Sequence, residues 1–487
     1  MIDVRAHQEE ISEGMSLTAW IGLFLGPALL LVCLLTPPPE GMSEAAWSTV
    51  GMTLLMAVWW ATEAIPIPAT SLLPILLIPA LHINTLKNAT SPYAHPTIFL
   101  FMGGFLLGLA MQRWNLHKRI ALITLRAMGG KPVNQIAGFM IATAFISMWV
   151  SNTATTIMML PIGLSIIGLI AGEDRGTEKE RERFATALLL GIAYAASIGG
   201  MATLIGTPPN ANLAANMQQQ GIHIGFGQWM LIGIPVSISL LAVTWWWLTR
   251  KGFALTGQGS EELIKQELIK LGPLSKAEKR VGLVFIAAAL AWIFQRLIAM
   301  KFPGVDDTTI AMAAAIALFI IPVNIHKRVF LMNWNHTSSM PWGILLLFGG
   351  GLAMAGAIDS SGLAQWIAGN LEGLKVLPLF LIMAIVVLII VFLTEVTSNT
   401  ATAATFIPLV SAVAIKSLGM SPTTLAVPVA LAASCAFMMP VATPPNAIVF
   451  STGHMHISSM IRAGFALNIA STVILTVLCF FLVQWVF

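Results

Sequence analysis

The chain has 487 residues, of which 57% are hydrophobic and 9% are charged, and its formal net charge is +4. Soluble globular proteins carry about 25% charged residues, so this composition excludes a soluble enzyme or binding module and predicts a polytopic membrane protein. The small surplus of basic residues is spread over several loops. We therefore expect no nucleic-acid partner.

Eleven apolar segments follow one another along the chain, and most approach the roughly 20 residues needed to cross a hydrocarbon core about 30 Å thick. They lie near residues 17–36, 46–63, 65–83, 97–114, 185–217, 226–249, 281–299, 308–325, 341–358, 424–450 and 460–486. The sequence thus predicts an all-α fold with about 11 transmembrane helices. Cys33, Cys435 and Cys479 lie singly in apolar segments and are interpreted as small core residues.

Two further apolar segments, 133–171 and 377–417, are broken in the middle by Ser-Asn-Thr. If each is a re-entrant helical hairpin, the chain ends face opposite sides of the membrane. With the N-terminus inside, twenty Lys and Arg residues fall on the inner side and five on the outer side. This positive-inside bias supports a cytoplasmic N-terminus, an outer C-terminus and two hairpins in a plasma or bacterial inner membrane.

Two motifs occur twice. Ser-Asn-Thr-Ala-Thr begins at residues 151 and 398, and Thr-Pro-Pro-Asn-Ala begins at residues 207 and 443. In the predicted topology the two hairpins enter from opposite sides, so the repeat is inverted, as in secondary transporters. The predicted parts are an N-terminal segment with the first helix (1–45), a first repeat (46–249), a cytoplasmic linker (250–280) and a second repeat (281–487). Each repeat contains one hairpin and one broken helix, 185–217 or 424–450.

The motifs offer the chemistry of an ion and anion site. Helix N-termini after a Ser-Asn-Thr turn present N–H donors that suit a carboxylate. Hydroxyl, amide and freed carbonyl oxygens, the last near Gly206 and Ala442, suit a hard cation such as sodium. The prolines of the second motif prevent a continuous helix. For a single copy, packing residues and a proline kink are the simpler interpretation, but two duplicated motifs favour a site.

No Lys or Arg lies at the Ser-Asn-Thr tips or beside the Thr-Pro-Pro-Asn breaks. A bound anion would therefore depend on neutral donors and on bound cations, which favours coupled binding. Glu63 and Glu395 are candidates for function because an ionised group inside a membrane is costly. A proton relay is one interpretation; we favour a role for Glu63 in capping helix starts and for Glu395 in supporting the second hairpin.

With these motifs, and with "WWATEAIPIPATSLLP" from Trp59, the sequence resembles the divalent anion/sodium symporter family, also called the INDY or sodium-dicarboxylate family. The resemblance covers nearly the whole chain. It implies a homodimer within membrane lipid, in which each protomer has a scaffold domain and a transport domain that moves as an elevator.

The resemblance also implies the site residues. Sodium would bind at two places, formed by Ser147, Ser151, Asn152 and Gly206 and by Thr394, Ser398, Asn399 and Ala442. The substrate carboxylates would lie among Asn152, Thr153, Thr207, Ser398, Asn399, Thr400, Thr443 and Pro444. Sodium ions would couple transport, with no other cofactor.

The predicted function is sodium-coupled symport of C4-dicarboxylates such as succinate, fumarate or malate. Two alternatives stay open: a sodium-independent dicarboxylate exchanger, and a sodium-coupled transporter of citrate or sulfate. An intramembrane enzyme is disfavoured because the spans show neither a nucleophile with a base nor a set of metal ligands. An ion channel is a weaker alternative.

Overall fold

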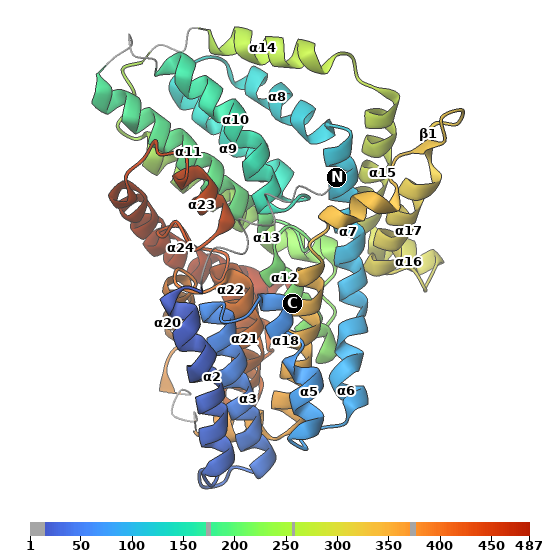
Figure 1. Cartoon of the computed structure of the whole chain (residues 1–487), viewed down its shortest axis with the longest axis vertical. Helices are drawn as coiled ribbons and strands as arrows, with labels where there is room; N and C mark the ends of the chain where they lie inside the picture. Colours follow the sequence, from blue (N-terminus) through green and yellow to red (C-terminus); the bar gives the residue numbers. More distant parts are fainter. Residues whose placement is uncertain (1–14, 172–176, 256–258, 371–375) are drawn as a thin grey trace.

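A computed structural model describes residues 15–171, 177–255, 259–370 and 376–487, and most of them are helical. Figure 1 shows an elongated molecule with α2 and α3 at one end and α8 and α14 at the other. The helices up to residue 249 are α2 (Leu17–Leu35), α3 (Glu44–Thr62), α4 (Ile67–Thr70), α5 (Leu73–Ala80), α6 (Leu86–Thr90), η1 (Ser91–Ala94), α7 (Pro96–Arg113), α8 (Leu116–Met128), α9 (Pro132–Ser147), α10 (Asn152–Ile170), α11 (Glu178–Gly200), α12 (Pro208–Gln219) and α13 (Phe226–Thr249).

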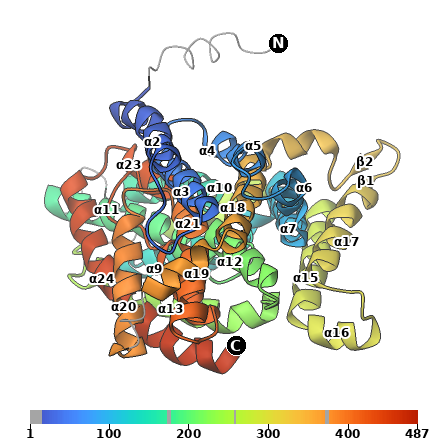
Figure 2. The same ribbon diagram turned by 90° about the horizontal axis from the view of Figure 1, so that it is seen from below.

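The second part of the chain contains helices and two short strands. They are α14 (Ser260–Leu271), α15 (Lys276–Ile293), α16 (Gln295–Lys301), α17 (Asp307–Ile320), β1 (Pro322–Asn324), β2 (Val329–Phe330), η2 (Trp334–Ser339), α18 (Trp342–Ser360), α19 (Leu363–Asn370), α20 (Leu379–Leu393), α21 (Asn399–Ala412), the π-helical turn η4 (Val413–Ser417), α22 (Thr423–Ala432), α23 (Pro444–Phe450) and α24 (Ile457–Val486). Figure 2 shows α15–α17 and the strands on one side, and α11, α20 and α24 on the other.

Within the described residues, eight helices are long and apolar enough to cross a membrane. A ninth span results if α15 and α16, which meet at an angle of 79°, count as one. The chain is therefore a multi-pass membrane protein, while the count of eleven stays a prediction. Cys33, Cys435 and Cys479 are all buried, as expected.

Several predicted spans need correction. The segment 65–83 is two short helices, α4 and α5, because prolines begin both of them. The segment 281–299 bends after Ile293, and 308–325 ends as a helix at Ile320. The chain then forms the antiparallel pair β1–β2, so the fold is not purely α-helical.

The expectation that Glu63 caps helix starts is wrong. Glu63 is the residue at the C-terminal end of α3, where it adopts a left-handed conformation with φ of 49°. Its side chain is exposed. Glu63 therefore ends a helix instead of beginning one.

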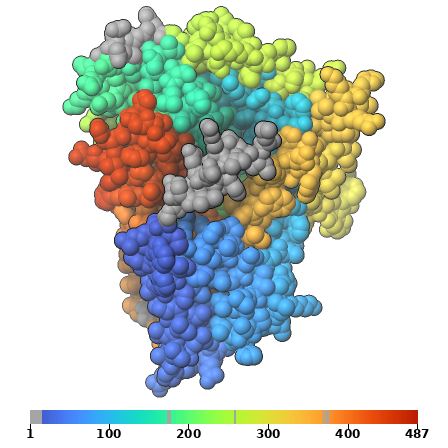
Figure 3. All heavy atoms as spheres, viewed as in Figure 1, coloured from blue at the N-terminus to red at the C-terminus, as the bar shows by residue number. Residues whose placement is uncertain are grey.

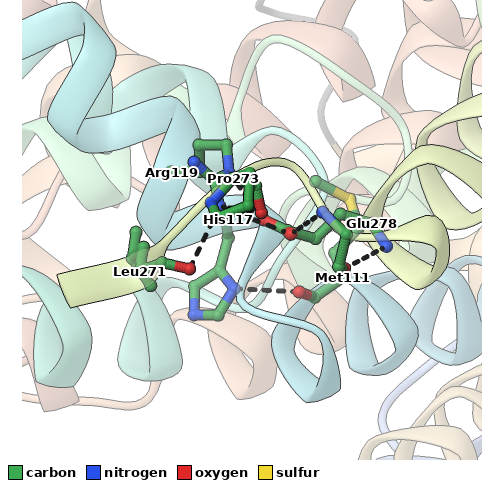
Figure 4. A network of polar contacts seen from close by, with 7 residues as sticks. Met111, His117, Arg119, Leu271, Pro273 and Glu278 are labelled. Atoms are coloured by element: carbon green, nitrogen blue, oxygen red, sulfur yellow. Dashed lines mark hydrogen bonds and ion pairs between the residues drawn. The ribbon is translucent and has the colours of Figure 1, made fainter. Parts of the chain in front are cut away.

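The part of the predicted linker that the structure describes is tied to α8. Arg119 Nε donates to Glu278 Oε1 at 2.6 Å, and Ser275 and Glu278 form a capping box at the start of α15. Figure 4 shows this network, in which the Arg119 side chain also reaches the carbonyl groups of Leu271 and Pro273. Lys118 pairs with Glu267 of α14 at 3.1 Å. The basic residues of α8 thus fix the position of the 259–280 segment.

Candidate functional site

The first Ser-Asn-Thr tip joins α9 to α10 and clusters three oxygen atoms. The hydroxyl oxygen of Ser147 lies 2.7 Å from Asn152 Oδ1 and 2.7 Å from the carbonyl oxygen of Ala196 in α11. A hydroxyl has a single hydrogen, so it can satisfy only one of these two acceptors. Ser147 is fully buried. The cluster therefore has more acceptor oxygens than donated hydrogens, which suits a cation.

The second tip repeats this arrangement between α20 and α21. Thr394 Oγ1 lies 2.7 Å from Asn399 Oδ1 and 2.9 Å from the carbonyl oxygen of Ala433, which follows α22. Thr394 and Asn399 each stand 247 residues after Ser147 and Asn152. The predicted residues of each sodium set, Ser147 with Asn152 and Thr394 with Asn399, are thus in direct contact. Beside each pair lies a backbone carbonyl, of Ala196 or Ala433, that was not predicted.

The Thr-Pro-Pro-Asn motifs begin new helices after a break, as predicted. The helix α11 ends at Gly200 and α12 begins at Pro208, while α22 ends at Ala432 and α23 begins at Pro444. Prolines fill the first two positions of both new helices, so these N-termini have fewer free N–H groups for an anion. The breaks consequently present mainly carbonyl oxygens.

The asparagine of each motif stabilises the non-helical segment that precedes its helix. Asn210 Nδ2 donates to the carbonyl groups of Gly200 at 3.3 Å and Thr203 at 2.8 Å. Asn446 Nδ2 donates to those of Ala436 and Met439, both at 3.1 Å. These two residues were not predicted to be functional, although their place in a repeated motif was a signal that could have identified them.

Gly200 brings the first tip and the first break together. A Cβ atom added at Gly200 would lie 2.7 Å from Asn152 Oδ1 and 2.9 Å from the carbonyl oxygen of Gly206. Both oxygens therefore converge on the same small space. In the second half Ala436 and Ala442 stand at the positions that correspond to Gly200 and Gly206.

The starts of α10 and α21 keep free N–H groups. Ser151 Oγ accepts only from Ala154 N, at 3.3 Å, and Ser398 makes no side-chain cap. Within the described residues, the N–H groups of Asn152, Thr153, Asn399 and Thr400 have no hydrogen-bond acceptor. All four residues are partly exposed. These two helix starts can therefore receive an anion.

Glu395 was expected to support the second hairpin, and it connects that hairpin to the loop of the second break. Its carboxylate accepts hydrogen bonds from the backbone N–H groups of Phe437 (2.6 Å), Met438 (2.9 Å) and Met439 (3.0 Å). Asn468 Nδ2 of α24 donates to the same carboxylate at 2.7 Å. Glu395 is 3% exposed. The carboxylate thus anchors the loop that follows α22. Asn468 was not predicted, because its only signal in the sequence is an amide in an apolar helix.

In the first half, a single neutral hydrogen bond links the positions that correspond to Glu395 and Met439. Met148 and Thr203 correspond to Glu395 and Met439 at the two repeat offsets, and Thr203 Oγ1 donates to the carbonyl oxygen of Met148 at 2.5 Å. The same pair of positions is therefore linked in both halves, by a hydroxyl in one and by a carboxylate in the other.

The two tips also differ in how they are packed. Trp149 is 7% exposed and stacks on Phe226 with a centroid distance of 5.8 Å; it also contacts Phe285 of α15 at 4.8 Å. The corresponding Val396 is 69% exposed. The first tip is therefore held by an aromatic cluster, and the second is open.

Within the described residues, Thr207 and Thr443 make no side-chain hydrogen bond to either tip. Thr443 Oγ1 accepts from Asn446 N at 3.3 Å, whereas Thr207 is buried and makes no side-chain cap. Pro444 is exposed and Ala442 is buried. The halves do meet, because α10 contacts α23 and α12 contacts α21. No hydrogen bond joins the two tips within the described part of the chain.

Comparisons with known proteins agree with this architecture. The family model for the sodium:sulfate symporter transmembrane region matches residues 17–487. Sodium-dependent dicarboxylate transporters SdcS of Staphylococcus aureus strains USA300 and MRSA252 are each 43% identical to this chain, over 95% of its length and 90% and 91% of theirs.

Two solved structures share the fold. They are MtrF of Neisseria gonorrhoeae, from a class of antimetabolite efflux pumps (TM-score 0.57, 14% identity, 97% of this chain and 96% of that one), and the YdaH transporter of Alcanivorax borkumensis (TM-score 0.54, 14% identity, 89% and 98%). The chain therefore belongs to the sodium:sulfate symporter family of membrane transporters, as its resemblance to the divalent anion/sodium symporters indicates.

Proposed function

We propose that the protein is a sodium-coupled importer of C4-dicarboxylates such as succinate, fumarate and malate. The observation that carries the proposal is the duplicated oxygen cluster, Ser147 with Asn152 and Thr394 with Asn399, each beside a broken helix. Unwound carbonyl groups and hydroxyls of this kind hold sodium in secondary transporters, and half-helix N-termini hold anions. The substrate named in the SdcS relatives supports a dicarboxylate.

In this proposal each half binds one sodium ion. The first uses Ser147, Ser151, Asn152 and the carbonyl of Gly206, and the second uses Thr394, Ser398, Asn399 and the carbonyl of Ala442. The closeness of Asn152 Oδ1 to the Gly206 carbonyl supports the first set. Because Ser151 Oγ already accepts from Ala154, we assign it the weakest role in this set.

The two substrate carboxylates would each face one helix start. The free N–H groups of Asn152 and Thr153 would receive one, and those of Asn399 and Thr400 the other, with Ser398, Thr207, Thr443 and Pro444 around them. The ion pairs of Lys118 with Glu267 and of Arg119 with Glu278 lie on α8, α14 and α15 and not at the tips. Bound sodium would supply the positive charge, and this requirement couples the two binding events.

We extend the proposal to an elevator movement in a homodimer, with an inverted repeat, a cytoplasmic N-terminus and an outer C-terminus. The family membership and the positive-inside bias support this part. The proposed domains are those that the repeat defines, 46–249 and 281–487 with the linker between them.

The test is uptake of labelled succinate into liposomes that contain the purified protein, under an inward gradient of sodium or of choline. We expect accumulation only with sodium, and competition by unlabelled fumarate and malate above that by citrate or sulfate. Equal uptake in choline that rises after the lumen is preloaded with dicarboxylate would replace the symporter by an exchanger. Competition led by citrate or sulfate would replace the C4 substrate.

Two variants locate the site in the same assay. Asn152→Ala and Asn399→Ala each remove a carboxamide oxygen from one cluster. We expect each to abolish sodium-dependent uptake. Asn88→Ala is the matched control, because Asn88 is an exposed asparagine of α6. Unchanged transport in both tip variants would exclude the tips as the site.

A further inference from the structure

A groove of about 390 Å³ lies between α7, α17, η2 and the start of α18. Its lining includes Met102, Leu106, Met312, Ile316, Phe319 and Trp334. Ile316 is 52% exposed and Trp334 is 66% exposed, so the groove opens at the surface. The proposed transport function makes no use of it.

Two polar groups of the groove already donate hydrogen bonds within the protein. Thr337 Oγ1 donates to the carbonyl oxygen of Trp334 at 2.7 Å, and Trp342 Nε1 donates to the carbonyl oxygen of Thr337 at 3.0 Å. The hydrogens of these two groups are therefore not free for a ligand. The groove therefore suits an apolar chain.

The groove follows the direction of the membrane-crossing helices. Residues 312, 315, 316 and 319 form one stripe along α17, which covers about 10 Å at 1.5 Å per residue. One leaflet of the hydrocarbon core is about 15 Å thick. The groove is thus long enough to hold much of an acyl chain of one leaflet.

Basic residues gather where the groove ends. The helices α7 and α17 run in the same direction, since Thr308 near the start of α17 bonds to Pro96, and Trp114 after the end of α7 bonds to Leu331. The far end therefore carries Arg113 and the β1–β2 turn with Lys327 and Arg328. Figure 1 shows β1 at the same end as α8 and α14, and Figure 3 shows this hairpin protruding at the upper right.

No acidic residue of the same stretch of chain offsets the positive charge at this end. Residues 308–358 contain no Asp or Glu, and Lys327 and Arg328 are exposed. Within the described residues neither makes an ion pair. Desolvation and the charge of Arg113 both lower the pKa of His336 in η2, so the field of Arg113 reaches the rim of the groove.

We propose that this groove binds an anionic glycerophospholipid of the surrounding membrane, with an acyl chain along α17 and the headgroup phosphate beside Arg113, Lys327 and Arg328. Basic pockets between transmembrane helices on the cytoplasmic side bind anionic headgroups, and the positive-inside bias predicts that this end is cytoplasmic. The charge and the apolar stripe together match one amphiphile.

A second copy of the chain fits the groove less well. A two-fold interface centred here would place the same patch of both copies face to face. The basic rims around Arg113, Lys327 and Arg328 would then meet like charges. A phospholipid brings the opposite charge instead.

The experiment is native mass spectrometry of the full-length protein purified in detergent. Dioleoyl phosphatidylglycerol is compared with dioleoyl phosphatidylcholine, which has the same acyl chains, and with glycerol 3-phosphate, which has none. We expect bound phosphatidylglycerol to dominate and no retained glycerol 3-phosphate. The double variant Lys327→Ala, Arg328→Ala should bind about thirtyfold more weakly, since each charge contributes about 1 kcal/mol near an anionic headgroup. Lys301→Ala, in which another exposed lysine is removed, is the control.

The acyl part is tested by filling the groove. Ile316→Trp should remove the bound lipid, whereas Ile320→Trp, one turn further on the same helix and 65% exposed, should leave it. Met312→Trp serves if the first variant does not fold. The proposal would be overturned if both lipids bound equally, if both Ile variants lost lipid equally, or if glycerol 3-phosphate were retained. It would also be overturned if the protein were a tight dimer that Ile316→Trp dissociates without any change in bound lipid.

Discussion

Asn152 Oδ1 lies 2.7 Å from the place that a Cβ atom would take at Gly200. The same added atom would lie 2.9 Å from the Gly206 carbonyl oxygen, so Gly200→Ala must displace two oxygens of the first proposed sodium site. We expect this variant to need at least about tenfold more sodium for half-maximal uptake. A tenfold change corresponds to a loss of about 1.4 kcal/mol in the free energy of sodium binding.

Gly168→Ala in α10 is the control for that change, because nothing lies within 4 Å of its added Cβ. Wild-type sodium dependence in Gly200→Ala would mean that the first cluster holds no cation.

Thr394→Val removes one hydroxyl and keeps the shape of the side chain. The hydroxyl lies 2.7 Å from Asn399 Oδ1 and is fully buried, so its loss takes one oxygen from the second cluster. We expect the sodium concentration for half-maximal uptake to rise about tenfold. Thr394→Ser restores the hydroxyl and should restore sodium dependence; failure of this rescue would assign Thr394 a packing role.

Glu395→Ala should destabilise the protein. The substitution leaves the N–H groups of Phe437, Met438 and Met439 and the amide of Asn468 without their acceptor. Breaking a buried, charged network costs about 3 kcal/mol or more, which thermal unfolding in detergent would detect. Glu63→Ala, at an exposed site, should change the free energy of unfolding by less than about 0.5 kcal/mol. Equal effects in both variants would contradict the anchoring role.

Trp149→Ala and Val396→Ala compare the two tips at corresponding positions. Trp149 is packed against Phe226 and Phe285, so its truncation should cost about 3 kcal/mol. Val396 is 69% exposed, so Val396→Ala should change the free energy of unfolding only slightly. Intrinsic fluorescence during denaturation measures both. A larger effect at Val396 would show that the open tip is covered in the membrane.

The ion pairs of Glu267 give a pH dependence. Hydrogen bonds from Lys270, then from Lys118, hold the pKa of Glu267 below its usual value. A lowered folded-state pKa means that the contribution to stability is present above the unfolded pKa of about 4.3 and is lost as the pH falls through the folded value. Glu267→Gln should therefore lower the unfolding temperature at pH 7, and this difference should shrink as the pH falls below about 4.3. A difference that stays constant as the pH falls would mean that packing, not charge, holds α14.

Much of the candidate site could be predicted because its polar residues and prolines lie in short sequence motifs. The repeat aligned Ser147 with Thr394 and Asn152 with Asn399, and the resemblance to the symporter family grouped Ser147 with Asn152 and Thr394 with Asn399. The prolines of each motif predicted the breaks. The carbonyl groups of Ala196 and Ala433 could not be predicted, because every residue has a carbonyl and only folding selects one. The β1–β2 pair was missed because its strands are too short for a pattern.

The sequence by itself determined the class of the protein, its two hairpin tips and its two broken helices, since hydrophobic length, prolines and repeated polar residues act locally. Tertiary structure decided the rest. It placed Gly200 where two oxygens converge, turned Glu395 into the anchor of three N–H groups, and buried Trp149 while leaving Val396 open. These differences depend on contacts between residues far apart in the chain, where nearly identical motifs meet different neighbours.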